Sequence, residues 1–287
     1  ATMRFYDIST GTGRLRSDRS VDVIVREWRA DCGGAGYCLW AYDESLSLLW
    51  RHDVAVPYGH HAAVRFFDVD GDGRDEVLAG GTLLDGEGTV LWEHDRGGDL
   101  LEQNEHYDAA FIGRYAGDAE LDPTVFFIAG GPGVYAADAR TGRTRTAHKI
   151  GHAQWACPCR VREDLPGSQV LVGTRHGSYG ILVLFSGRGD RLWTIQPDYR
   201  GAGLQPVQWL PDGPQHLWVN STRRAMGLYD GYGRQVHVLE RIRAVCDRFR
   251  PRPDGPVRPY RVLRRTPDGP DLLAVPGTDF SGFRGFP

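Results

Sequence analysis

Residues 152–195 read HAQWACPCRVREDLPGSQVLVGTRHGSYGILVLFSGRGDRLWTI, and this stretch contains a pattern that recurs along the chain. A histidine comes first, followed by an apolar run, a polar turn, a second apolar run and a glycine turn before another strand. Two earlier stretches have the same order, so that His60, His106 and His152 follow one another at intervals of 46 residues. A period of roughly 40 to 50 residues with several short strands per unit is typical of β-propeller blades.

The period also predicts a site. Blades repeat about a central axis, so equivalent positions of successive blades lie side by side around it. We therefore expect His60, His106 and His152 to converge on one face of the molecule. One period further along, the chain has Asp198 next to Tyr199 and Arg200.

Strand patterns dominate the rest of the chain, and no segment keeps a helical spacing of apolar residues for long. We predict an all-β fold, a single β-propeller domain over residues 1–287 with about seven blades. Four blades are clear between about residues 20 and 240. Residues 241–287 form an arginine- and proline-rich tail, and the last blade is expected to be irregular or incomplete. Trp50, Trp92 and Trp193 occupy strand positions suited to packing between blades.

The composition indicates one globular unit and excludes some partners. The 287 residues are 41% apolar with a formal net charge of −3, so bulk charge implies neither a nucleic-acid nor a membrane partner. No apolar run reaches the roughly 18 residues of a membrane helix, and the first residues do not resemble a signal peptide. Five cysteines are too few for a disulfide scaffold at this length. We expect a monomer.

The most specific local motif is DVDGDGRDE at residues 68–76. Oxygen ligands at its positions 1, 3, 5 and 9, with glycines that permit a tight turn, suit a hard cation such as calcium. The predicted ligands are Asp68, Asp70, Asp72 and Glu76, and the role is structural. The glutamate at position 12 of an EF-hand is missing, and the alternative is an acidic turn without metal.

Several segments together resemble a known family. They are residues 39–43 (LWAYD), 59–60 (GH), 68–73 (DVDGDG), 83–85 (LLD), 90–92 (VLW), 151–154 (GHAQ), 164–167 (DLPG) and 227–234 (GLYDGYGR). Over roughly residues 21–238 the chain resembles the β-propeller polysaccharide lyases, namely the ulvan lyases and rhamnogalacturonan lyase-like proteins. The resemblance implies cleavage of an acidic, rhamnose-containing glycan by β-elimination at a uronic acid, and a secreted or periplasmic location.

Elimination requires a positive charge against the uronate carboxylate, a base for the C5 proton and an acid for the leaving oxygen. By resemblance, His60 matches the catalytic histidine and Arg175 the arginine that neutralises the carboxylate. Tyr107 and Tyr199 compete for the role of the family tyrosine. A second histidine that some relatives carry would fall near Gly81 and Thr82, where this chain has none.

Further polar residues near the repeat positions are candidates for substrate binding: His61, His106, His152, Gln154 and His176. The histidines at the repeat positions, His60, His106 and His152, have a structural alternative as hydrogen-bond partners of the neighbouring blade. Cys157 and Cys159 are a weak zinc signal, and buried thiols are the alternative. Trp155 is a candidate for stacking on a sugar.

Two classes of function therefore remain open. The first is a lyase acting on an ulvan-like polysaccharide, and the second is a non-catalytic propeller that binds a glycan or a protein. An exo-acting enzyme on terminal rhamnose-glucuronate units is a third possibility.

Overall fold

The structure is a computed structural model that describes residues 8–29, 36–54, 63–95, 106–131, 133–175, 180–197, 203–210, 212–220, 227–237, 261–264 and 271–274. Within these ranges the ordered elements are β-strands, and no helix occurs. Accordingly, none of the described residues belongs to a helix with the length and apolarity needed to cross a membrane.

The strands form five antiparallel four-stranded sheets, each from consecutive strands, which we call the first to fifth blades. The first blade contains β1 (Ile8–Gly13), β2 (Asp22–Arg29), β3 (Gly36–Tyr42) and β4 (Leu48–Val54). The second contains β5 (Arg65–Phe67), β6 (Glu76–Ala79), β7 (Thr82–Leu84) and β8 (Val90–Glu93). The third contains β9 (Tyr107–Gly113), β10 (Thr124–Ala129), β11 (Gly133–Asp138) and β12 (Thr144–Lys149).

The fourth blade contains β13 (Ala153–Cys159), β14 (Gln169–Thr174), β15 (Leu182–Ser186) and β16 (Arg191–Ile195). The fifth contains β17 (Gly203–Val207), β18 (His216–Asn220), β19 (Gly227–Tyr229) and β20 (Gln235–His237). A two-stranded sheet follows, made of β21 (Arg261–Arg264) and β22 (Asp271–Ala274).

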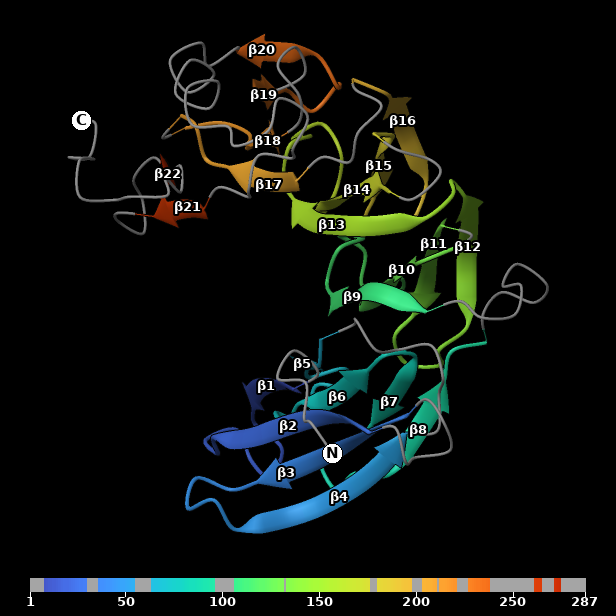
Figure 1. Cartoon of the computed structure of the whole chain (residues 1–287), viewed down its shortest axis with the longest axis vertical. Helices are drawn as coiled ribbons and strands as arrows, with labels where there is room; N and C mark the ends of the chain where they lie inside the picture. The colour runs from blue at the N-terminus through green and yellow to red at the C-terminus, as the bar shows by residue number, and fades with distance from the viewer. Residues whose placement is uncertain are drawn as a thin grey trace.

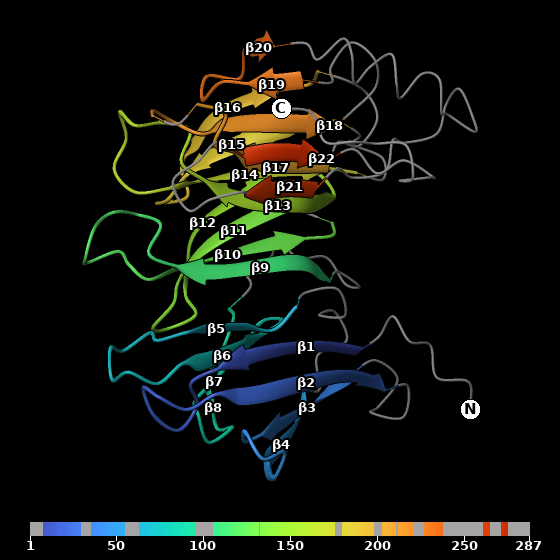
Figure 2. The ribbon, with the colours of Figure 1, turned by 90° about the vertical axis from the view of Figure 1, so that its left-hand side faces the viewer.

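The blades follow one another along an arc, with the first strand of each blade on the inner side (Figure 1). These inner strands touch in chain order: β1 with β5, β5 with β9, β9 with β13 and β13 with β17. Figure 2 shows the same sheets stacked face to face from β4 to β20. The prediction of an all-β fold built from propeller blades is confirmed.

Two details differ from the sequence-based expectation. The described residues contain five four-stranded blades where the sequence showed four clear ones, because β1 is rich in serine, threonine and glycine and has no apolar alternation. The tail, expected to be irregular, also contains a regular strand, since β21 lies inside its arginine- and proline-rich part.

Apolar packing between blades supplies the core. One cluster of buried apolar side chains fills each of the four interfaces between successive described blades. Strand β10 (TVFFIA) is buried at all six positions because it has a neighbouring blade on each face. Central strands of this kind need apolar residues without alternation, and β14 (QVLVGT) has the same pattern.

A tryptophan on the outermost strand of a blade donates a hydrogen bond to the β-hairpin of the next blade. The indole nitrogen of Trp50 bonds to the carbonyl of Gly86, that of Trp92 to Ala139 and that of Trp193 to Gly231, each at 2.8 Å. The turn glycine Gly142 has a φ of +69°, and a Cβ there would lie 2.6 Å from the Trp92 ring. The predicted role of these tryptophans between blades is confirmed.

The third blade has no tryptophan at this position. The hydroxyl of Thr146 and the Nε2 of His148 instead meet the carbonyl of Gly189, at 3.2 and 2.7 Å. Polar side chains of the third blade therefore replace the indole at the junction with the fourth.

This contact can be tested in the second blade. Trp92→Phe should lower the free energy of unfolding by about 1 to 3 kcal/mol, because it leaves the buried Ala139 carbonyl without a donor. The neighbouring Leu91 is 52% exposed, so Leu91→Ala should change stability by less than about 0.5 kcal/mol. Urea unfolding measures both, and equal losses would contradict the role given to Trp92.

Candidate functional site

His106 and His152 lie at equivalent ends of neighbouring inner strands. His106 precedes β9, and its carbonyl accepts a hydrogen bond of 2.7 Å from the amide of Gly130. His152 precedes β13, and its carbonyl accepts one of 2.8 Å from the amide of Arg175. Because β9 and β13 are adjacent, residues 46 positions apart in the sequence come together.

Each of these strands then contains a β-bulge. In β9, Ala109 pairs with Ile128 and Tyr107 with Ala129, which leaves Asp108 as the extra residue. In β13 the extra residue is Gln154, again 46 positions later. A bulge breaks the alternation of a strand and re-aims a side chain.

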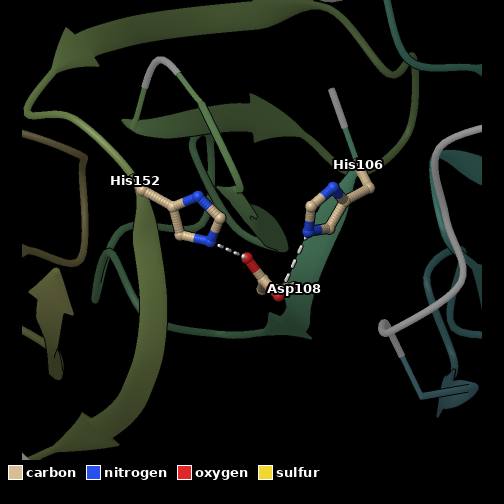
Figure 3. A group of neighbouring side chains, drawn as sticks. All are labelled: His106, Asp108 and His152. Carbon is tan, nitrogen blue, oxygen red and sulfur yellow. Dashed lines mark ion pairs between the residues drawn. The ribbon is translucent and has the colours of Figure 1, made fainter. Parts of the chain in front are cut away.

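The bulge of β9 places Asp108 between the two imidazoles (Figure 3). One carboxylate oxygen lies 3.4 Å from Nε2 of His106, and the other lies 3.1 Å from Nε2 of His152. The ring centroids are 5.7 Å apart at an angle of 66°. We call these three residues the His–Asp–His cluster. It joins the third blade to the fourth.

The cluster consists of a buried carboxyl group and two partly exposed imidazoles. The Asp108 side chain is 4% exposed, whereas those of His106 and His152 are 22% and 18% exposed. The Oδ2 atom of Asp108 lies at ion-pair distance from His152 yet accepts no hydrogen bond. The Oε1 atom of Gln154 is also buried without a hydrogen bond.

Arg175 joins this region through its backbone. It directly follows β14, and the bond from its amide to His152 anchors it at the same end of the inner strands. Its guanidinium carbon lies 5.4 Å from the centroid of the Trp155 ring, a cation–π contact. Of the residues predicted from sequence, the structure thus brings His106, His152 and Arg175 into one region.

Tyr107 is separated from the cluster. It faces the opposite side of β9 from its neighbours His106 and Asp108, is 3% exposed, and its hydroxyl lies 2.6 Å from Nδ1 of His94. The other nitrogen of His94 lies 3.0 Å from the hydroxyl of Thr144. Tyr107 therefore belongs to the packing between the second and third blades, which corrects its assignment as a catalytic candidate.

Other predicted residues lie outside the described ranges, namely His60, His61, His176 and Tyr199. Conversely, sequence reasoning missed Asp108. Its signal was the same 46-residue spacing, since His106–x–Asp108 recurs as His152–x–Gln154.

The acidic loop at residues 68–76 brings three of its four predicted ligands together. Oxygens of Asp68, Asp70 and Glu76 lie within 4.8 Å of one another. Asp72 instead forms an ion pair of 2.8 Å with Arg74. Three converging carboxylates fit a hard cation such as calcium.

Burial of Glu76 supports a cation in this loop. Removal from water, together with the charges of Asp70, Asp72 and Asp68, raises the pKa of Glu76 to about 7, although the amide of Val69 donates to it at 2.6 Å. A bound cation would favour the charged carboxylate and reverse this shift.

The paired cysteines fit the alternative of buried thiols. Cys157 and Cys159 pack with the apolar cluster between the fourth and fifth blades. Burial raises the pKa of Cys157 to about 12 and holds the pKa of Cys159 well above its usual value, so both thiols stay protonated. Neither belongs to a group of three candidate metal ligands among the described residues.

Comparisons with known proteins place this fold. A scan against protein-family models finds no match, and a search of curated proteins finds none either. Among solved structures, the rhamnogalacturonan lyase YesW aligns with 73% of this chain and 34% of its own, at 22% identity and a TM-score of 0.53. A Bacillus licheniformis rhamnogalacturonan lyase aligns with 73% of this chain and 34% of its own, at 20% identity and a TM-score of 0.54.

The exotype rhamnogalacturonan lyase YesX aligns with 74% of this chain and 37% of its own, at 21% identity and a TM-score of 0.53. At these identities the likeness establishes a shared fold, and the chain spans only about a third of the length of these lyases.

The acidic loop gives a test that depends on pH. In the metal-free protein, folding raises the pKa of Glu76 from 4.5 to about 7. Protonated Glu76 therefore stabilises the folded state at low pH, and this contribution to the free energy of unfolding is lost as the pH rises from 4.5 to about 7. Calcium competes with that proton. The rise in melting temperature caused by calcium should therefore be larger at about pH 8 than at about pH 5.5.

Glu76→Gln is the control, since it removes the titrating carboxyl at similar volume. It should flatten this difference, and Asp70→Ala should weaken the calcium response at both pH values. Melting temperatures that are equal in calcium and in chelator across the pH range would exclude a bound cation.

Proposed function

We propose that this chain is the propeller portion of a polysaccharide lyase that cleaves an acidic, rhamnose-containing glycan by β-elimination at a uronic acid. The observation that carries the proposal is the meeting of His106, Asp108 and His152 at one end of two inner strands, with Arg175 bonded beside them. The fold shared with three rhamnogalacturonan lyases supports the same class of reaction.

The chemistry explains why positive groups are needed there. The C5 proton of a uronic acid is weakly acidic while the adjacent carboxylate is charged. A guanidinium paired with that carboxylate stabilises the enolate-like transition state, where negative charge develops. Arg175 has this role in the proposal, and Trp155 beneath its guanidinium holds the side chain in place.

The remaining roles follow the sequence-based assignment. His60 takes part in proton transfer with Tyr199, and His61, His106, His152, Gln154 and His176 bind the substrate. The buried hydroxyl of Tyr107 is hydrogen-bonded to His94, so Tyr199 is the remaining tyrosine of the two proposed.

The substrate is either ulvan-like or rhamnogalacturonan-like. The sequence resemblance favours ulvan, whereas the three solved structures are described as rhamnogalacturonan lyases, one of them exotype. Both polymers present a uronate next to rhamnose, so the same carboxylate-binding centre serves either. A protein with this activity would be secreted or periplasmic, where it meets the polysaccharide.

One observation favours the alternative of a non-catalytic glycan-binding propeller. Some relatives carry a second histidine near the position of Gly81 and Thr82, and a Cβ at Gly81 would lie 2.9 Å from the Tyr107 ring. A histidine at Gly81 would therefore require Tyr107 to move. If the chain binds without cleaving, this departure is the reason.

Absorbance of the unsaturated uronate product, measured with ulvan and with rhamnogalacturonan, decides between these functions. Arg175→Ala should lower the rate by about 100- to 1,000-fold, because a charge partner of the transition state is lost. His60→Ala should have a similar effect.

Arg188→Ala is the matched control. Arg188 forms a surface ion pair with Asp118 at 3.1 Å, so its loss should leave the rate nearly unchanged. Full elimination activity in Arg175→Ala would refute its role. Binding of either polymer without product would establish the glycan-binding alternative.

A further inference from the structure

We infer that His106, Asp108 and His152 form a binding site for one divalent transition-metal ion of the zinc class, with a coordination position left open for a uronate carboxylate. The metal binding stands on the geometry alone. Only the identity of the group in the open position rests on the proposed function.

The first argument is the spacing of the ligand atoms. One nitrogen from each imidazole and one oxygen of Asp108 all lie within 4.8 Å of one another. Nε2 of His106 is 3.4 Å from Oδ1 of Asp108, and Nε2 of His152 is 3.1 Å from Oδ2. Ligands about 2.0 to 2.1 Å from a tetrahedral zinc ion are separated by about 3.4 Å. The cluster therefore needs only a small contraction to close around an ion.

The second argument is the unsatisfied oxygen. Asp108 is a carboxylate whose side chain is 96% removed from solvent, and its Oδ2 accepts no hydrogen bond although His152 Nε2 is 3.1 Å away. A simple histidine–aspartate pair would align the N–H with the oxygen. Here the two groups lie at ion-pair distance without a hydrogen bond, which leaves this oxygen available to a bound ion.

The third argument is the choice of ion. Imidazole nitrogens favour zinc, copper and nickel, whereas calcium prefers a set of oxygens. The acidic loop at residues 68–76 offers carboxylates only, so the two sites of this chain should separate calcium from zinc. Three protein ligands with a fourth position open is the arrangement of catalytic rather than structural zinc.

The location explains what the ion would do. His106 and Asp108 belong to the third blade and His152 to the fourth, so the ion would join two blades at the junction that lacks a tryptophan. Arg175, bonded to His152, lies at the same end. Together they would present two positive groups to one uronate carboxylate.

Isothermal titration with zinc chloride tests the site, using untagged protein stripped by chelator and then saturated with calcium. One zinc ion per chain should bind, and the melting temperature should rise by about 5 to 10 °C at a zinc concentration of about 100 times Kd. Cobalt should bind in its place with a tetrahedral spectrum that lacks a sulfur-to-metal charge-transfer band.

Asp108→Asn and His152→Gln keep the side-chain volume and should each lower zinc affinity at least about 10-fold. Asp70→Asn in the acidic loop, His237→Gln on an exposed strand and Cys157→Ser in the apolar core should bind zinc like the wild type. Circular dichroism of the metal-free variants checks that each is folded.

Failure of the wild type to bind zinc or cobalt, or unchanged affinity in both Asp108→Asn and His152→Gln, would overturn the inference. Zinc binding lost in these variants, with no elimination activity in any form of the protein, would leave the metal site standing and refute the lyase. Elimination activity unaffected by chelator in a protein that binds no zinc would do the reverse.

Discussion

The junction between neighbouring blades is the constraint on which this structure depends. A single four-stranded sheet leaves two apolar faces, and burying them requires the next blade at a defined rotation. Apolar burial alone does not fix the orientation of one blade on the next. The hydrogen bond from an indole on one blade to a hairpin carbonyl on the next is directional, so it does fix this orientation. Because the same junction recurs, residues at one repeat position end up as neighbours in space.

The candidate site is a consequence of that regularity at one junction. Between the third and fourth blades, two inner strands are each preceded by a histidine and carry a bulge two residues after it. The bulge converts a strand position that would pair with its neighbour into one that aims a carboxylate between two imidazoles. At the same junction, polar side chains replace the indole contact on the outer strand. At this junction, a polar contact between the outer strands thus accompanies the ionisable groups that meet at the inner strands.

The fold and part of this site could be predicted from sequence. The 46-residue period was enough to expect His106 and His152 side by side, since it needs only the blade repeat. Asp108 was missed because its orientation depends on a bulge in the strand register, which the alternation of apolar residues does not reveal. Tyr107, on the opposite side of the same strand, is buried in the core. In the acidic loop, Asp68, Asp70 and Glu76 converge as their spacing suggested. Asp72 does not, because Arg74 two residues away pairs with it.

We propose that the junction of the third and fourth blades receives a uronate carboxylate. A crystal structure of the protein with a uronate- and rhamnose-containing oligosaccharide tests this proposal most directly. We expect the carboxylate within hydrogen-bonding distance of the Arg175 guanidinium and beside the His–Asp–His cluster. An oligosaccharide bound on another face, or at this junction with its carboxylate turned to solvent, would contradict it.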